Sequence, residues 1–152
     1  MPRLPPDTIV ARYVGGLHLD PGTGQINGSA FERTAKDIDG VSFTRRGILA
    51  IGTQQDRAAI RQVMASRLRL GATAVFAELQ AGTALDALSE FEQAVSFVED
   101  ALAADGDRLA NPAHALLLGF PFRGEQVGSL KSEVAGDRLR SCIIDRFPAA
   151  PT

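Results

Sequence analysis

Hydrophobic and polar positions alternate with a period of two in the amino-terminal third of the chain. In the run 9–14 (IVARYV), Ile9, Ala11 and Tyr13 fall on one face and the other residues on the opposite face, which predicts a strand. Residues 41–44 (VSFT) alternate in the same way, and residues 25–33 are expected to form a further extended segment. This part of the chain is therefore predicted to consist mainly of strands and turns.

The rest of the chain shows the period of three to four residues that is typical of amphipathic helices. Residues 54–70 and 84–104 each carry such an apolar stripe. A third helix is expected to begin between residues 125 and 133 and to end near residue 145, because Pro148 prevents its continuation.

The order of these elements indicates an α+β protein. Two nearly continuous apolar runs, 73–79 and 113–120, predict buried strands between the helices. Because strands come first and later alternate with helices, we expect a mixed sheet of about five strands with three helices packed mainly on one face. Residues 1–7 contain three prolines and are predicted to form a flexible arm, followed by a single α+β domain over residues 8–152.

Composition and charge disfavour some classes of function. The net charge of −2 argues against general binding to nucleic acids, which requires an excess of Lys and Arg. The single cysteine, Cys142, cannot form an intrachain disulfide, and its apolar helical neighbours predict a core position rather than a nucleophile. The sequence shows no signal peptide and no membrane-spanning run, so we expect a cytoplasmic protein without membrane contact.

The two histidines, His18 and His114, are the first candidates for chemistry because an imidazole can take up or release a proton near neutral pH. Both are expected where a turn meets a strand. A serine among small residues could expose its hydroxyl, an arginine could hold an anion, and a carboxylate could assist. The expected catalytic residues, if the protein is an enzyme, are His114, Arg12, Ser29 and Glu125.

Arg12 lies in a predicted strand, where burying its charge without a partner would be costly. Its side chain is therefore expected to meet solvent, a carboxylate or a phosphate, and an exposed arginine paired across the sheet is the simpler alternative. The sequence has no nucleotide-binding fingerprint and no close spacing of metal ligands, so no cofactor and no metal are predicted. The candidate binding residues are Arg12, His18, Arg33, Arg57 and Arg61.

Several short motifs occur together: R-Y-V at 12–14, I-N-G-S-A-F-E-R at 26–33, D-G-V-S-F at 39–43 and N-P-A-H-A-L-L-L-G-F-P at 111–121. As a set they resemble a group of small bacterial proteins that share an R-Y-V opening, a G-x-A-F turn followed by an arginine, and a P-x-H-A-x-x-x-G-x-P strand. The resemblance implies no activity. It implies that the following residues form one cluster: Arg12, Gly28, Phe31, Arg33, His114 and Pro121.

Two classes of function stay open. The first is a non-enzymatic protein-interaction or regulatory component of a bacterial multi-protein system. It is favoured by the lack of catalytic motifs and by a basic stretch (45–69) followed by an acidic one (78–107), which could orient a protein partner or could simply neutralise each other as solvated faces.

The alternative is a small transferase or hydrolase that acts on a phosphate-bearing or nucleotide-like substrate. An ADP-ribosyltransferase-like enzyme, for example, could use Arg12, Ser29 and Glu125. Binding of DNA or RNA through the arginines of residues 57–69 is the least favoured hypothesis, because the predicted helix has no Asn in a turn-helix context to read bases and the total charge is negative.

Overall fold

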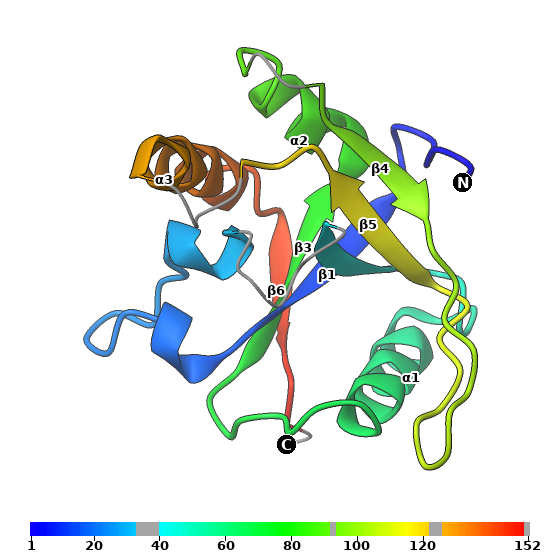
Figure 1. The fold of residues 1–152 in the computed structure, drawn as a ribbon. Coiled ribbons are helices and arrows are strands. Elements are labelled where there is room, and N and C mark those ends of the chain that lie inside the picture. The colour runs from blue at the N-terminus through cyan, green and yellow to red at the C-terminus, as the bar shows by residue number, and fades with distance from the viewer. Residues whose placement is uncertain (33–39, 92–93, 122–125, 151–152) are drawn as a thin grey trace.

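The computed structural model describes residues 1–32, 40–91, 94–121 and 126–150 of the chain. Six strands form one sheet in the order β4-β5-β2-β1-β3-β6, and every adjacent pair is antiparallel (Figure 1). The strands are β1 (Ile9–Val14), β2 (Val41–Arg45), β3 (Val75–Gln80), β4 (Ser96–Glu99), β5 (His114–Leu118) and β6 (Asp145–Pro148). The helices are α1 (Thr53–Ala65), α2 (Ala81–Ala87) and α3 (Gln126–Arg140), with two 3₁₀ turns, η1 (Gly16–His18) and η2 (Gly28–Phe31).

The α+β class is confirmed, but the predicted sheet was wrong in type and slightly short. The sheet is antiparallel rather than mixed, and it has six strands rather than about five among the described residues. The number differs because residues 96–99, predicted as helix, and residues 145–148, without a predicted strand, form β4 and β6, whereas the extended segment predicted at 25–33 contains the 3₁₀ turn η2. Phe97 and Val98 of β4 instead pair with Leu117 and Leu116 of β5, because burial in the sheet outweighs the helical period.

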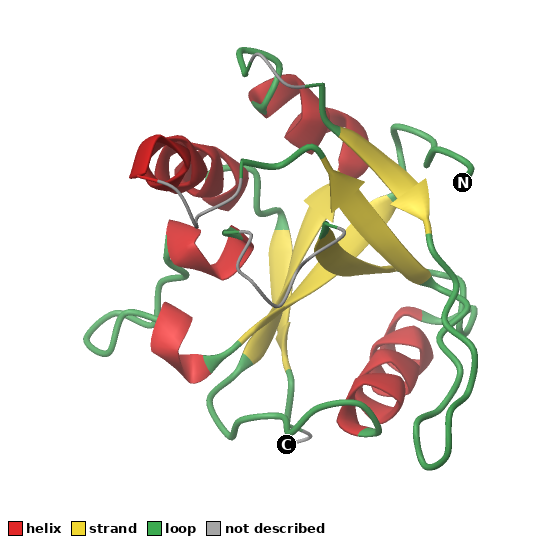
Figure 2. Ribbon diagram, in the orientation of Figure 1, coloured by secondary structure: helices red, strands yellow, loops and turns green. Residues whose placement is uncertain are grey.

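The helices lie on both faces of the sheet, α2 and α3 on one and α1 on the other, so the prediction that they pack mainly on one face is not confirmed. Alternate residues of a strand point to opposite faces. In β1, Val10 belongs to the core that includes residues of α2 and α3, whereas Ala11 belongs to a smaller core that includes Ile60 of α1. The pictures agree, with the sheet in the centre, α1 on one side, and α2 and α3 on the other (Figures 1 and 2).

The amino-terminal segment, for which the prolines predicted a flexible arm, contacts the sheet. Leu4 N donates a hydrogen bond to Phe97 O (3.0 Å), and Glu99 N donates to Pro2 O (2.8 Å). The Leu4 side chain is buried in the larger core. The physical reason is that β4 is the last strand of the sheet, so its outer backbone groups need hydrogen-bond partners. The prolines still allow residues 2–4 to supply them, because Pro2 accepts through its carbonyl and Leu4 donates through its N–H.

Strands β1 and β2 separate soon after they meet. β1 pairs with β3 along all six of its residues, but its pairing with β2 covers Val10 and Ala11 alone. Beyond this point Arg12 spans the widening gap, because its Nη1 donates to Ser42 O (3.0 Å) and its Nε to Ala30 O (3.0 Å). The side chain thus supplies hydrogen bonds where the backbone ladder ends.

Turn η2 is held in place by a close approach of two glycines. A Cβ atom at Gly28 would lie 2.4 Å from Asp137 Oδ1 and 2.9 Å from the carbonyl carbon of Gly136. In the reverse direction, a Cβ at Gly136 would lie 2.4 Å from Gly28 O. The backbones of η2 and α3 are therefore in direct contact, and this contact fixes the position of Ser29.

We predict that Gly28→Ala lowers the free energy of unfolding by about 1–3 kcal/mol, since the added methyl group must push η2 away from α3. Urea denaturation followed by circular dichroism measures the change. Gly15→Ala is the matched control, because its Cβ would have open space around it, with its nearest neighbour at 3.9 Å, and its backbone is extended (φ −66°). Equal stabilities of the two variants would contradict the role given to the glycine contact.

Candidate functional site

A cavity of about 610 Å³ lies at the separation of β1 and β2. It is lined by residues of β1, β2, η1, η2, the end of α1 and the segment that precedes β5. Its lining includes residues whose side chains point to opposite faces of the sheet. Its polar lining consists of Arg12, Tyr13, His18, Ser29, Glu32, Ser42, Thr44, Arg67, Arg69, Asn111 and His114.

Four of the residues singled out from the sequence line this one cavity: Arg12, His18, Ser29 and His114. They come from β1, η1, η2 and β5, so the fold and not the local sequence brings them together. Arg33 and Glu125 lie outside the described residues. Of the motif residues, Gly28 and Phe31 are buried in η2 beside this site.

His114 is held by Asp100, the residue that follows β4. His114 Nδ1 lies 2.9 Å from Asp100 O and 3.1 Å from Asp100 Oδ2. The His114 side chain is 11% exposed, so solvent does not compete strongly for these contacts. Both partners of Nδ1 are acceptors, and the hydrogen of the neutral ring must therefore sit on Nδ1.

His18 forms a second pair with Ser29. His18 Nδ1 lies 2.8 Å from Ser29 Oγ, a normal hydrogen-bond distance. The pair connects η1 to η2. The backbone of His18 is also held, because Asn27 N donates a hydrogen bond to His18 O (2.8 Å). A hydroxyl beside an imidazole can exchange a proton with it, so this pair is a second group with acid–base capacity in the cavity.

Asn111 and Tyr13 complete the wall. The fully buried Asn111 donates from Nδ2 to Thr44 Oγ1 (3.4 Å) and accepts from Ala113 N at Oδ1 (3.2 Å), which orients the backbone just before His114. Gly71 N donates to Tyr13 Oη (2.9 Å), so the loop after α1 is tied to β1. These contacts give the cavity a rigid frame.

Among the described residues of the cavity lining, positive charges outnumber negative ones, although the whole chain has a net charge of −2. Arg67 donates to Leu109 O (2.7 Å) and Ala103 O (3.0 Å), which are neutral carbonyls, so these bonds orient the guanidinium without cancelling its charge. Arg69 is exposed at the same wall. Within the part of the lining that the structure describes, Glu32 is the one carboxylate. An anion is therefore the ligand that this lining favours electrostatically.

Arg57 and Arg61 lie elsewhere, where they attach α1 to the sheet. The guanidinium of Arg57 is paired with Glu78 and with Asp145 (Nη2 to Oδ2, 3.0 Å), and Arg61 Nε donates to Pro148 O (2.7 Å). Both guanidinium groups also lie over the ring of Phe147, at 4.8 and 5.3 Å from its centre. They do not line the cavity.

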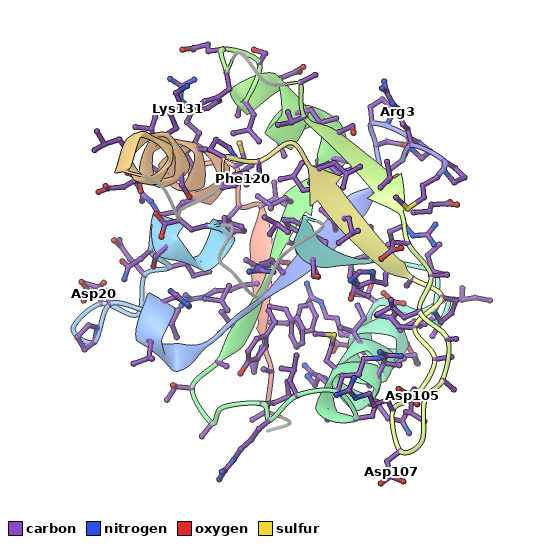
Figure 3. All side chains as sticks on the ribbon, in the orientation of Figure 1. Arg3, Asp20, Asp105, Asp107, Phe120 and Lys131 are labelled. Atoms are coloured by element: carbon purple, nitrogen blue, oxygen red, sulfur yellow. The ribbon has the colours of Figure 1, made fainter. Side chains whose placement is uncertain are left out.

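The basic and acidic stretches of the sequence largely face each other inside the fold. Arg46 Nη1 lies 2.8 Å from Oε2 of the buried Glu78, and Arg45 Nη1 lies 2.9 Å from Glu99 Oε1. Burying Glu78 is tolerated only because it meets two guanidinium groups. Two other acids of this stretch, Asp105 and Asp107, lie at the tip of a loop that points away from the body of the molecule (Figure 3).

Sequence reasoning missed Asp100 and Asn111. Asp100 was placed inside a predicted helix, where it would have been one more exposed acid. The signal that could have found Asn111 is its position in N-P-A-H, two residues before a buried strand, where its side chain can accept from the backbone of a turn.

Among the residues that the structure describes, no three His, Cys, Asp or Glu side chains come close enough to hold a metal ion. Within the same residues, no helix has the length and hydrophobicity needed to cross a bilayer.

In comparisons with known proteins, no family model, no curated sequence and no solved structure matches the chain. The function has to be inferred from the geometry of the site itself.

We predict that Cys142 reacts slowly with thiol reagents. Burial raises the pKa of its thiol, so the thiolate fraction at a given pH is smaller than that of a free cysteine. Its Sγ also lies 3.3 Å from Arg138 O, and it does not line the cavity. The rate with 5,5′-dithiobis(2-nitrobenzoate) at pH 8 should be at least roughly fivefold lower for the native protein than for the protein in urea. Equal rates would show an accessible, reactive thiol.

Proposed function

We propose that the protein is a small enzyme that binds a phosphate-bearing, nucleotide-like molecule in the cavity between β1 and β2. The observation that supports this most is the convergence of Arg12, His18 and His114, from three separate elements, on one cavity. Convergent polar groups in a partly apolar cavity are the usual arrangement of a small-molecule site.

Size and composition suit a molecule with an aromatic part and a charged part. The volume of about 610 Å³ falls within the range of ligand pockets. Met64 and Leu68 provide apolar surface against which a flat ring could pack. Arg67 and Arg69 are placed where a phosphate group could meet them.

The acid–base groups favour a transfer or hydrolysis reaction. In such a reaction a hydroxyl or a water molecule loses a proton as it attacks, and the leaving oxygen gains one. His114 and His18 are two separate groups that could serve these needs, and Ser29 is the hydroxyl nearest to His18. These groups favour an enzyme over the interaction module that the lack of catalytic motifs favoured.

A protein-interaction or regulatory role loses part of its support in the structure. One argument for this role, beside the lack of catalytic motifs, was the contrast between the basic stretch 45–69 and the acidic stretch 78–107. Because Arg45, Arg46 and Arg57 are paired with Glu99 and Glu78, much of that contrast is cancelled within the molecule.

We predict that ADP gives a saturable heat signal in isothermal titration calorimetry and that Arg69→Gln weakens its binding by roughly fivefold, since an exposed charge contact contributes up to about 1 kcal/mol. Raising the salt concentration should weaken binding to the wild type more than to the variant. Arg140→Gln is the matched control, because Arg140 is exposed on α3 and is not part of the lining.

Titrations with inorganic phosphate and with adenosine would show which part of ADP the cavity recognises. The proposal fails if none of these molecules binds, or if Arg69→Gln and Arg140→Gln weaken the binding of ADP equally.

A further inference from the structure

We infer that Asp100 is a positioning residue that fixes His114 as the Nδ1-protonated tautomer and makes Nε2 of His114 the base of the cavity. The inference rests on the proposed function for the identity of the ligand. The arrangement of Asp100 and His114 itself depends on contacts between described residues and can be tested without a ligand.

The tautomer follows from the partners of Nδ1. A neutral imidazole has one N–H and one nitrogen with a lone pair. Asp100 O and Asp100 Oδ2, at 2.9 and 3.1 Å, can both only accept a hydrogen bond from Nδ1. The lone pair is therefore on Nε2, the nitrogen that can take a proton from a ligand.

The direction of the ring follows from the cavity lining. His114 lines the cavity whereas Asp100 does not. The edge of the ring that carries Nδ1 is turned to Asp100, so the opposite edge, with Nε2, is the one that remains for the cavity. Thr44, which is paired with His114 across β2 and β5, lies beside it on the same face and also lines the cavity.

Asp100 is itself held by the sheet. The pairing of β4 with β5 ends at Glu99 and Ala115, and the next backbone bond runs from Asp100 N to His114 O (2.9 Å). The same residue thus binds the backbone of His114 through its N–H and the side chain through its carbonyl and its carboxylate. This triple contact holds the imidazole in one orientation, which a catalytic base requires.

The charge of Asp100 also matters when Nε2 takes up a proton. The resulting imidazolium would lie against the carboxylate, at the 3.1 Å that separates Nδ1 from Oδ2, which stabilises it. In hydrolysis of a phosphate ester, Nε2 would take the proton of a water molecule as its oxygen bonds to phosphorus. The bond from phosphorus to the leaving oxygen breaks, and that oxygen keeps the electron pair and takes a proton from solvent.

Nuclear magnetic resonance tests the tautomer directly. The chain has two histidines, so a ¹⁵N–¹H spectrum of the rings contains two sets of signals, and His18→Gln assigns them. At alkaline pH we expect the ¹⁵N shifts of His114 to show a protonated Nδ1 and an unprotonated Nε2. The opposite pattern, or an even mixture of the two tautomers, would overturn the inference.

Alkylation tests the role of Asp100. Iodoacetate forms a bond from Nε2 to its methylene carbon as iodide leaves, and its own negative charge suits the cavity. In a Cys142→Ser background, peptide mass spectrometry should find His114 modified, and about tenfold more slowly in Asp100→Ala, because the developing charge loses its partner. Asp105→Ala is the control, an exposed acid of the same segment without contact to either histidine.

Asp100→Asn provides a second variant that keeps the shape of the side chain and removes its charge, and it should also slow alkylation if Asp100→Ala fails to fold. Equal rates in the folded Asp100 and Asp105 variants would leave Asp100 with a structural role alone and overturn the inference. If ADP binds to the wild type without protecting His114 from iodoacetate, Nε2 is not beside the ligand and the inference also fails. If ADP does not bind while the tautomer and the rates are as expected, the proposed ligand is wrong and the pair of Asp100 and His114 stands.

Discussion

The separation of β1 from β2 is the constraint on which the rest of the structure depends. A sheet normally keeps the backbone groups of neighbouring strands paired, and leaving them apart in the interior costs free energy. Here the guanidinium of Arg12 bonds to Ser42 O and Ala30 O, so it replaces part of the missing ladder and joins β2 to η2. One side chain therefore both permits the gap and places a positive charge at the cavity. An arginine suits this position because its planar group has several donors in fixed directions.

Much of the fold could be predicted from local patterns. The alternation in 9–14 and 41–44 and the apolar runs 73–79 and 113–120 correspond to β1, β2, β3 and β5, and the stripe in 54–70 corresponds to α1. The failures occurred where pairing with distant segments decides the structure. Residues 96–99 are a strand because β5 lies beside them. Residues 145–148 are a strand because β3 offers its edge, although the sequence before them is helical.

The candidate site could be predicted only as a list of residues. Histidine and arginine were singled out because few other residues of the chain have suitable chemistry, but nothing in the spacing of His18 and His114 shows that they line one cavity. The pairing register of the strands and the position of the 3₁₀ turns bring the two histidines to the same cavity. Asp100 illustrates the limit, since its contact with His114 requires β4 to pair with β5. Arg57 and Arg61 were candidate binding residues that do not line the cavity. Their partners Asp145 and Pro148 lie in β6, a strand that the sequence did not predict.

The contact of residues 2–4 with β4 has a consequence for the order of folding. The first residues of the chain cover the outer edge of a strand that lies almost a hundred residues later, so this contact forms only after the intervening chain has been made and has folded back. Contacts between such distant segments form slowly because a long loop has to be closed first. During that time the unpaired backbone of 96–99 can associate with other chains, which makes the opening residues a protection against aggregation as well as a part of the sheet.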